Sequence, residues 1–148
     1  MSSAGHRVGN HSDTHPDFTK STSVEIRSQL ARAESAIFAR TGQSTKPLFR
    51  FPFGARTAQD IAVVNDAGYI PFRWTVDTLG WKGTSGGLDA SIVRQRVLDT
   101  AQPGQIVLMH VVANPDDGTT LDADALPGII DGLVAQGYGF VDLAHALG

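Results

Sequence analysis

Ile106-Val107-Leu108-Met109 is a continuous apolar run, and His110 follows it directly. A run of this kind is typical of a strand buried on both faces, as in a parallel sheet covered by helices. A histidine at the carboxyl end of such a strand lies at the edge where parallel α/β folds place their chemistry. This stretch therefore predicts both the class of fold and one residue of its site.

Two helical patterns lie in the first half of the chain. Thr22 and Glu25 have the spacing of a capping box, and apolar residues at helical intervals continue to Gly42. These residues predict a helix of about eighteen residues, which is a common length in globular domains. Thr57 is expected to cap a second helix that leads to Gly68.

Two further helical patterns lie on either side of the strand. We expect one helix after Ser91, ending at Pro103-Gly104, and one that Asp122 caps and that ends at Gly137. Extended segments alternate with the helices, and we expect them at residues 7–10, 48–51, 69–76 and 139–143.

Strand and helix in turn, with short connections, predict an α/β fold. The strands are expected to form a parallel sheet covered by helices, either open or closed into a barrel. The chain has 148 residues, the size of one ordinary domain, and we find no internal repeat or linker in it. Residues 1–148 are therefore expected to form a single domain.

Composition narrows the classes of partner. The formal net charge is −3, which gives no electrostatic reason to expect a nucleic acid or an anionic membrane as partner. Cysteine is absent, so disulfides and thiolate metal sites are excluded, and His, Asp or Glu must hold any metal. The first residues lack the apolar segment of an export signal, and the localisation stays open.

His11 and His15 are four residues apart. On a helical turn this spacing places two imidazoles on one side, where both can reach one divalent ion. The same spacing also fits two histidines that only cap or hydrogen-bond a surface loop. The spacing alone leaves both readings open.

Four polar clusters occur in order: His11-Ser12-Asp13-Thr14-His15-Pro16, Arg50-Phe51-Pro52-Phe53-Gly54, Asp77 with Trp81, and Leu108-Met109-His110. In order and rough spacing they resemble the second to fifth motifs of the polysaccharide deacetylases, the NodB-homology or carbohydrate esterase 4 family. The similarity continues through residues 137–143, so it covers nearly the whole chain. It implies an incomplete or distorted (β/α) barrel with roughly five parallel strands and flanking helices, an α/β fold.

The resemblance also implies a reaction, the hydrolysis of an acetyl group from a sugar, usually from the nitrogen of N-acetylglucosamine. His11 and His15 match the family's metal-binding histidines, and zinc is the expected ion, with cobalt, nickel or manganese as alternatives. Arg50 matches an arginine that orients the catalytic carboxylate. Phe53 lies where the family presents a backbone N–H to the developing oxyanion, and Pro52 shapes that loop.

By the same resemblance, His110 matches the general acid that protonates the leaving amine. Asp77 matches the acidic partner that keeps this imidazole charged and oriented. Such a partner is physically required, because a histidine at the end of a buried strand otherwise loses its proton through desolvation. Trp81 and Leu108, with Trp74, are expected either to form a wall on which a sugar ring stacks or to belong to the core.

The chain departs from the family in two places. The first motif, Thr-Phe-Asp-Asp-Gly, does not occur ahead of the histidines, so the general base and a third metal ligand are expected to be missing and the barrel to have an open edge. Asp116-Asp117-Gly118 is similar to the first motif but lies in an expected surface loop. Asp13, between the two histidines, is the better candidate to replace the aspartates of that motif. Gly80 stands where the fourth motif usually carries a second acidic residue.

The sequence thus predicts a metal-dependent deacetylase. Chitin oligosaccharides, peptidoglycan and acetylxylan are the substrates that the family suggests. The alternative is a non-catalytic or truncated module that retains metal and carbohydrate binding and that pairs with a second copy through its open edge. Family members are often secreted or associated with the cell envelope.

Overall fold

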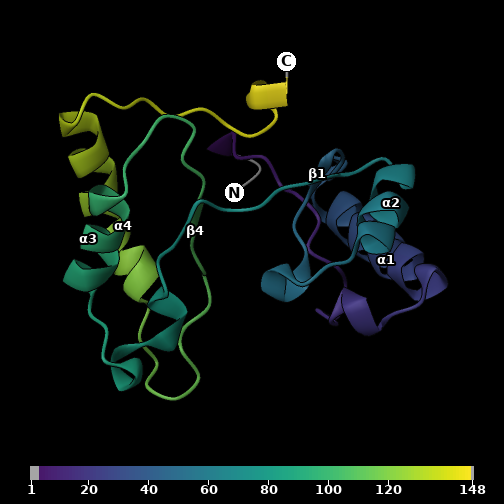
Figure 1. Ribbon diagram of the computed structural model, residues 1–148, viewed down its shortest axis with the longest axis horizontal. Coiled ribbons are helices and arrows are strands. Elements are labelled where there is room, and N and C mark those ends of the chain that lie inside the picture. Colours follow the sequence, from purple (N-terminus) through teal and green to yellow (C-terminus); the bar gives the residue numbers. More distant parts are fainter. Residues whose placement is uncertain (1–3, 148) are drawn as a thin grey trace. The chain divides into compact units, whose positions relative to one another are not determined.

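The computed structural model describes residues 4–147, whose path is shown in Figure 1. They form two compact units, which are described separately. The first unit comprises the residues up to Arg73 together with those from Val141 onward, and the second comprises Trp74–Phe140. The expected single domain over residues 1–148 stays a prediction.

The first unit pairs two short parallel strands with two helices. β1 (Leu48–Phe49) and β2 (Ile70–Pro71) are parallel, with Leu48 opposite Ile70. The helices α1 (Ser23–Thr41) and α2 (Ala58–Asp66) pack against each other. The extended segment expected at residues 7–10 is reduced to a single parallel bridge from Asn10 to Phe49.

The helix ends in this unit are those that the sequence predicts. The Thr22 hydroxyl accepts the backbone N–H of Glu25 at 3.3 Å, and the Glu25 carboxylate accepts the backbone N–H of Thr22 at 2.7 Å. This capping box begins α1, and Gly42 ends it with a φ of 68°, a left-handed conformation that glycine adopts without strain. Thr57 begins α2 in the same reciprocal way with Asp60. Both predicted caps are confirmed.

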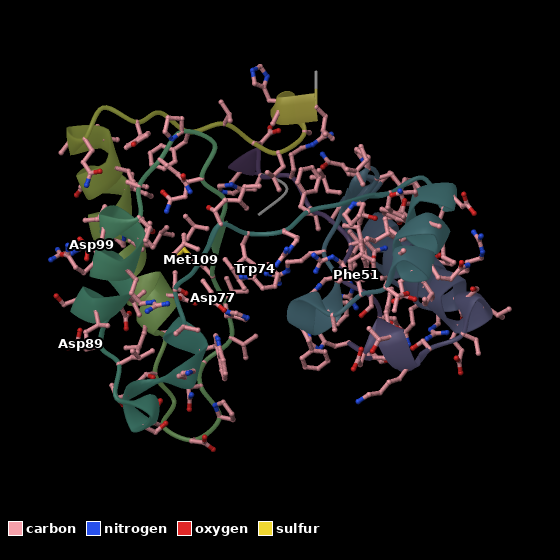
Figure 2. The ribbon with its side chains drawn as sticks, in the orientation of Figure 1. Phe51, Trp74, Asp77, Asp89, Asp99 and Met109 are labelled. Carbon is pink, nitrogen blue, oxygen red and sulfur yellow. The ribbon has the colours of Figure 1, made fainter. Side chains whose placement is uncertain are left out.

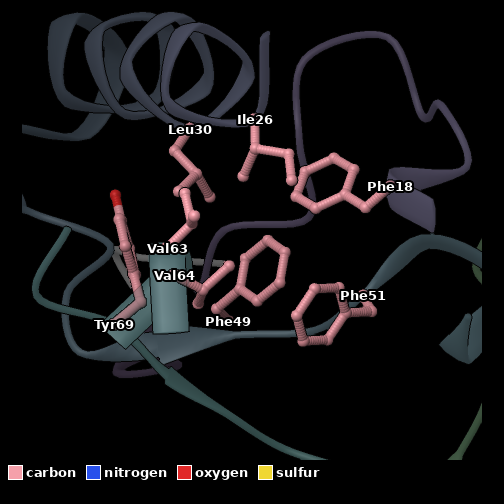
Figure 3. Close-up of a cluster of buried hydrophobic side chains, with 8 residues drawn as sticks. All are labelled: Phe18, Ile26, Leu30, Phe49, Phe51, Val63, Val64 and Tyr69. Atoms are coloured by element: carbon pink, nitrogen blue, oxygen red, sulfur yellow. The ribbon is translucent and has the colours of Figure 1, made fainter. Parts of the chain in front are cut away.

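The hydrophobic core of the first unit fixes the position of the motif that begins at Arg50. Phe49 and Phe51 are buried on either side of it, and their rings meet edge to face with centroids 4.9 Å apart. Figure 3 shows both rings among the side chains of α1, α2 and the preceding turn. Burying both neighbours fixes the backbone of Arg50. The cluster consists of Phe18, Ile26, Leu30, Phe49, Phe51, Val63, Val64 and Tyr69.

The second unit also pairs parallel strands with two helices. β3 (Val76–Asp77) and β4 (Val107–Leu108) are parallel, with Val76 opposite Val107. The apolar run at residues 106–109 is thus confirmed as a parallel strand, although only Val107 and Leu108 pair with β3. α3 (Ala90–Asp99) and α4 (Leu121–Ala135) lie side by side (Figure 1). Their core consists of Val93, Val97, Leu121, Ala125, Ile129 and Leu133.

Two predicted helix starts in the second unit are wrong. α3 begins two residues earlier than expected, because Asp89 caps it by accepting the backbone N–H of Ile92 at 2.8 Å. α4 follows Thr120, and Asp122 does not cap it. The carboxylate of Asp122 instead accepts the backbone N–H of His110, two residues after β4. The Asp122 carboxylate, which the sequence assigned to the start of α4, is therefore bonded to His110 instead.

Two predicted strands also differ. The segment expected over residues 69–76 contains two separate strands, β2 and the start of β3, which pair with different partners. Residues 139–143 lie outside every strand of the described chain. The parallel pairing and the helices between strands still confirm the α/β class. Within residues 4–147, no helix combines the length and the apolar character needed to cross a membrane.

Candidate functional site

His11 and His15 come together in a tight loop of the first unit. Asn10 pairs with β1 and is the last residue of that bridge, and its side-chain carbonyl accepts the backbone N–H of Ser12 at 2.9 Å. The Ser12 hydroxyl then accepts the backbone N–H of His15 at 3.0 Å. The two imidazole rings lie with centroids 4.9 Å apart and nearly perpendicular, at 77°. The loop therefore brings both predicted metal ligands side by side.

This loop is not the helical turn that the spacing suggested. Ser12 and His15 both have positive φ, 68° and 56°, which is uncommon for residues other than glycine. Two left-handed residues cost free energy that neighbouring hydrogen bonds must offset. Such backbone strain is concentrated at functional sites, and here it turns two imidazoles toward each other.

The hydrogen bond of His11 fixes which of its nitrogens carries a proton. Nδ1 lies 2.7 Å from the backbone carbonyl oxygen of Arg50. A carbonyl oxygen can only accept, so Nδ1 carries the hydrogen, and the neutral ring has its lone pair on Nε2. Metal-binding histidines show this arrangement, in which a carbonyl or carboxylate holds the other ring nitrogen.

The Arg50 motif supports the same loop. The backbone N–H of Arg50 donates to the Asn10 carbonyl at 3.0 Å, and the backbone N–H of Asn10 donates to the Leu48 carbonyl at 2.8 Å. These two bonds join the segment before His11 to β1 and its next residue. Pro52 is buried, whereas Phe53 is 69% exposed and has a φ of 57°. The Phe53 ring meets His15 edge to face at 4.5 Å. The structure thus brings Arg50, Phe53 and both histidines together, while their catalytic roles stay predictions.

Asp13 is engaged elsewhere. Its carboxylate lies 2.6 Å from Nε of Arg32 on α1, and its backbone N–H donates to Gln29 on the same helix. This ion pair turns the side chain toward α1 and does not support Asp13 as a third ligand. No group of three or more His, Asp or Glu residues that could hold a metal ion occurs within residues 4–147.

In the second unit, the carboxylate beside His110 belongs to Asp122. The backbone N–H of His110 donates to Asp122 Oδ2 at 2.6 Å, and His110 Nδ1 lies 3.8 Å from the same oxygen. Burial opposes ionisation of Asp122, but the adjacent His110 side chain and the His110 backbone N–H outweigh it. They lower the pKa of this carboxyl below its ordinary value. Asp122 is therefore the ionised partner of His110.

Asp77, which the sequence assigned to this position, has other contacts. It is the last residue of β3 and is labelled in Figure 2, and its carboxylate accepts the backbone N–H of Leu79 at 2.9 Å. Its carbonyl accepts hydrogen bonds from the guanidinium of Arg96. Among the described residues, the ion pair to His110 comes from Asp122 and not from Asp77. The expected pairing of Asp77 with His110 is therefore corrected.

The three residues of the predicted sugar wall differ in their exposure to solvent. Trp81 is 47% exposed, and its ring centroid lies 6.5 Å from that of His110. The buried amide of Asn114 donates to the Trp81 carbonyl at 2.8 Å and fixes this turn. Leu108 is 7% exposed and belongs to the strand pairing, and Trp74 is half-buried. Of these three residues, Trp81 is the exposed one beside His110, and its part in binding a sugar stays a prediction.

Asp117 holds a loop together. Its carboxylate accepts the backbone N–H of Ser85 at 2.6 Å and the Thr84 hydroxyl at 3.0 Å. The Ser85 N–H, followed by the hydroxyl and N–H of Thr119, keeps the pKa of Asp117 well below its ordinary range. These bonds occupy the carboxylate and do not support it as a substitute for the family's first motif.

Sequence reasoning missed two residues of this arrangement, Asn10 and Asp122. Asp122 had a detectable signal, because it shares the buried face of α4 with Ala125 and Ile129 at helical spacing. A carboxylate on such a face requires a partner. Asn10 carried no comparable signal, since its bonds reach α1 and Tyr69 across the core.

The chain resembles known proteins over almost its full length. Residues 1–72 match the family model described as polysaccharide deacetylase. A peptidoglycan-N-acetylglucosamine deacetylase, PgdA of Listeria monocytogenes, is 36% identical over 97% of this chain and 28% of its own length. The chain therefore spans less than a third of that enzyme.

Two solved structures are similar as well. A carbohydrate esterase family 4 pseudoenzyme from Bacillus anthracis is 34% identical, with a TM-score of 0.85 over 99% of this chain and 48% of that one. A family 4 carbohydrate esterase from Streptomyces lividans is 30% identical, with a TM-score of 0.76 over 95% of this chain and 68% of that one. These likenesses confirm the predicted fold, an incomplete (β/α) barrel of the deacetylase type, and the chain belongs to the polysaccharide deacetylase family, carbohydrate esterase family 4.

Proposed function

We propose that this chain acts in the metal-dependent removal of acetyl groups from acetylated amino sugars. The observation that carries the proposal is the 2.7 Å hydrogen bond between His11 Nδ1 and the Arg50 carbonyl. It holds Nε2 of His11 as a lone-pair donor, with the His15 ring beside it at 4.9 Å. Two imidazoles side by side are ligands suited to zinc and other first-row divalent ions.

The described donor set fits a metal in part. His11 and His15 would hold the ion, and the third ligand is unassigned because no cluster of three ligands occurs within residues 4–147. When bound, a divalent ion supplies polarisation of the acetyl carbonyl and activation of water. We propose zinc on availability, with cobalt, nickel and manganese as the ions to compare.

His110 is proposed as the proton donor. During amide hydrolysis the oxygen of water bonds to the acetyl carbon and the carbon–nitrogen bond breaks. The imidazolium of His110 gives a proton to the leaving nitrogen, and a proton that the water loses restores it. Asp122 stabilises the charged ring before the transfer. The exposed Phe53 turn is proposed to offer a backbone N–H to the developing oxyanion.

We propose an N-acetylglucosamine polymer as the substrate. The similarity to the Listeria peptidoglycan-N-acetylglucosamine deacetylase supports this class, and chitin oligosaccharides and acetylxylan are the alternatives. A neutral saccharide suits a chain with a formal net charge of −3. Trp81, half exposed beside His110, offers a face on which a sugar ring can stack.

Acetate release tests the proposal. The purified chain is incubated with chitin oligosaccharides and with peptidoglycan, after chelation and again with added zinc. We expect release that chelation abolishes, that zinc restores and that His11→Ala and His110→Ala both lose. The exposed His145→Ala is the matched control and should keep the rate. Release that persists in His11→Ala would overturn the metal site, and release that persists in His110→Ala would overturn the proton donor.

A second candidate is a non-catalytic module that retains metal and carbohydrate binding. Two observations favour it: the described residues hold no third ligand in a cluster, and the chain is 34% identical to a pseudoenzyme of the same family. This candidate predicts zinc binding without acetate release. Pairing of two copies is part of it, and a monodisperse monomer in sedimentation would count against that pairing.

A further inference from the structure

Asp122 and Gly80 occupy one volume beside His110. Asp122 lies in the first turn of α4 and is 3% exposed. A Cβ added to Gly80 would lie 2.2 Å from Asp122 Oδ1 and 2.6 Å from its Cγ, distances at which atoms overlap. The φ of Gly80 is not among the positive values, so its backbone does not require glycine. What requires glycine at position 80 is the carboxylate of Asp122.

The same carboxylate faces the one nitrogen of His110 that is buried. His110 Nδ1 and Asp122 Oδ1 are both shielded from solvent and have no hydrogen-bond partner among the described residues. The imidazole and the carboxylate are 3.8 Å apart, measured from His110 Nδ1 to the other carboxylate oxygen, Asp122 Oδ2. A buried donor and a buried acceptor without partners cost free energy, and a small rotation of the ring would pair them.

The ring is oriented by this contact. The His110 side chain is 36% exposed although its Nδ1 is buried, so the solvent-facing side of the ring carries Nε2. Two nearby candidates have other partners: the Thr78 hydroxyl donates to the Leu108 carbonyl at 3.1 Å, and the Asp77 carboxylate accepts the backbone N–H of Leu79. Asp122 is thus the charged group that can hold Nδ1.

We propose that Asp122 is the positioning residue of the proton donor His110, and that Gly80 is the complementary position that leaves room for its carboxylate. The inference rests on the proposed function for its catalytic consequence, but the geometry makes a prediction that needs no activity. A carboxylate hydrogen-bonded to Nδ1 keeps the proton on that nitrogen and directs Nε2 outward. A side chain from position 80 would enter the same space, so a carboxylate supplied from there should replace that of Asp122.

The variants follow from this exchange. Asp122→Asn retains the shape and an oxygen that can accept the His110 backbone N–H, but it removes the charge. Gly80→Asp combined with Asp122→Ala moves the carboxylate to the other side of the shared volume. Asp124→Asn is the matched control, because Asp124 is an exposed aspartate in the same helical turn. Asp77→Asn tests the partner that the sequence suggested.

Nitrogen-15 NMR of the histidine rings in the full chain gives the direct test. We expect His110 to carry its proton on Nδ1 in the unmodified chain, in Asp124→Asn, in Asp77→Asn and in the Gly80→Asp/Asp122→Ala exchange. In Asp122→Asn the Nδ1 population should fall at least twofold. A tautomer unchanged in Asp122→Asn, or one that shifts in Asp77→Asn instead, would overturn the inference. Thermal unfolding identifies a variant that fails to fold, and the exchange variant then carries the test.

Acetate release separates this inference from the proposed function. In an active chain, Asp122→Asn should lower kcat about tenfold or more with KM unchanged, since general acid catalysis contributes roughly a hundredfold or more. The exchange variant should recover most of the loss. If the unmodified chain releases no acetate while its NMR tautomers behave as expected, the proposed function fails and the positioning of His110 by Asp122 stands.

Discussion

Replacing Asn10 by alanine should destabilise the first unit by about 3 kcal/mol. The Asn10 amide donates to the Leu30 carbonyl and to the Tyr69 hydroxyl, each at 3.0 Å, and its oxygen accepts the Ser12 N–H at 2.9 Å. Each such bond contributes about 1 kcal/mol net. The residue is 2% exposed, so water does not replace these partners readily.

Urea and thermal unfolding measure this loss. At this chain length 1 kcal/mol lowers Tm by about 2–4 °C, so we expect a decrease of about 6–12 °C. Asn65→Ala is the matched control, because Asn65 is exposed on α2, and it should change the stability by less than about 0.5 kcal/mol. A loss in Asn10→Ala below about 1 kcal/mol, or one equal to that of the control, would refute the reasoning. Zinc binding should weaken as well, since Asn10 holds the loop of His11.

Three further predictions concern stability. Thr22→Ala should cost about 1 kcal/mol in urea unfolding by removing the capping box, and an unchanged midpoint would contradict that assignment. Val97→Ala, at a fully buried position, should cost about 2 kcal/mol from lost apolar burial and the cavity, whereas a cost near zero would show that the α3–α4 core is loosely packed. For Glu34, partial burial opposes ionisation, but hydrogen bonds from Ser44 and Thr45 outweigh it and lower the pKa of the carboxyl. Its ionised form therefore stabilises the fold above the ordinary value of about 4.3, and this contribution disappears as the pH falls through the lower folded-state pKa. The stability difference between the unmodified chain and Glu34→Gln should shrink from pH 7 to pH 3, and a constant difference would contradict the sign.

Local signals in the sequence predicted the features that depend on neighbouring residues. The helix caps at Thr22 and Thr57, the stop at Gly42 and the buried strand before His110 each follow from residues within one or two helical turns. The family motifs also placed the two histidines and Arg50 in one region. These features depend on local backbone chemistry or on motif order, both of which a single sequence contains.

The features that the sequence did not predict depend on contacts between distant segments. The left-handed loop of His11 and His15 is stabilised through Asn10 by bonds to Leu30 and Tyr69, which lie 20 and 59 residues away. Pairing of His110 with Asp122 instead of Asp77 depends on the contact between the first turn of α4 and the segment that follows β4. Gly80 gave a partial signal, because an acidic residue was expected there. The space that a side chain at position 80 would occupy is filled by the carboxylate of Asp122 from α4. No local sequence pattern indicates this contact.

Zinc binding by the histidine pair tests the central claim most directly. Isothermal titration of zinc into the chelator-stripped chain should show one ion bound per chain, with binding lost in His11→Ala and in His15→Ala and kept in His145→Ala. Substituting the Arg50 side chain does not test this site, because His11 donates its hydrogen bond to the backbone carbonyl of Arg50. Saturable binding with this pattern would support His11 and His15 as ligands. Absence of binding, or binding that survives His11→Ala unchanged, would contradict the account.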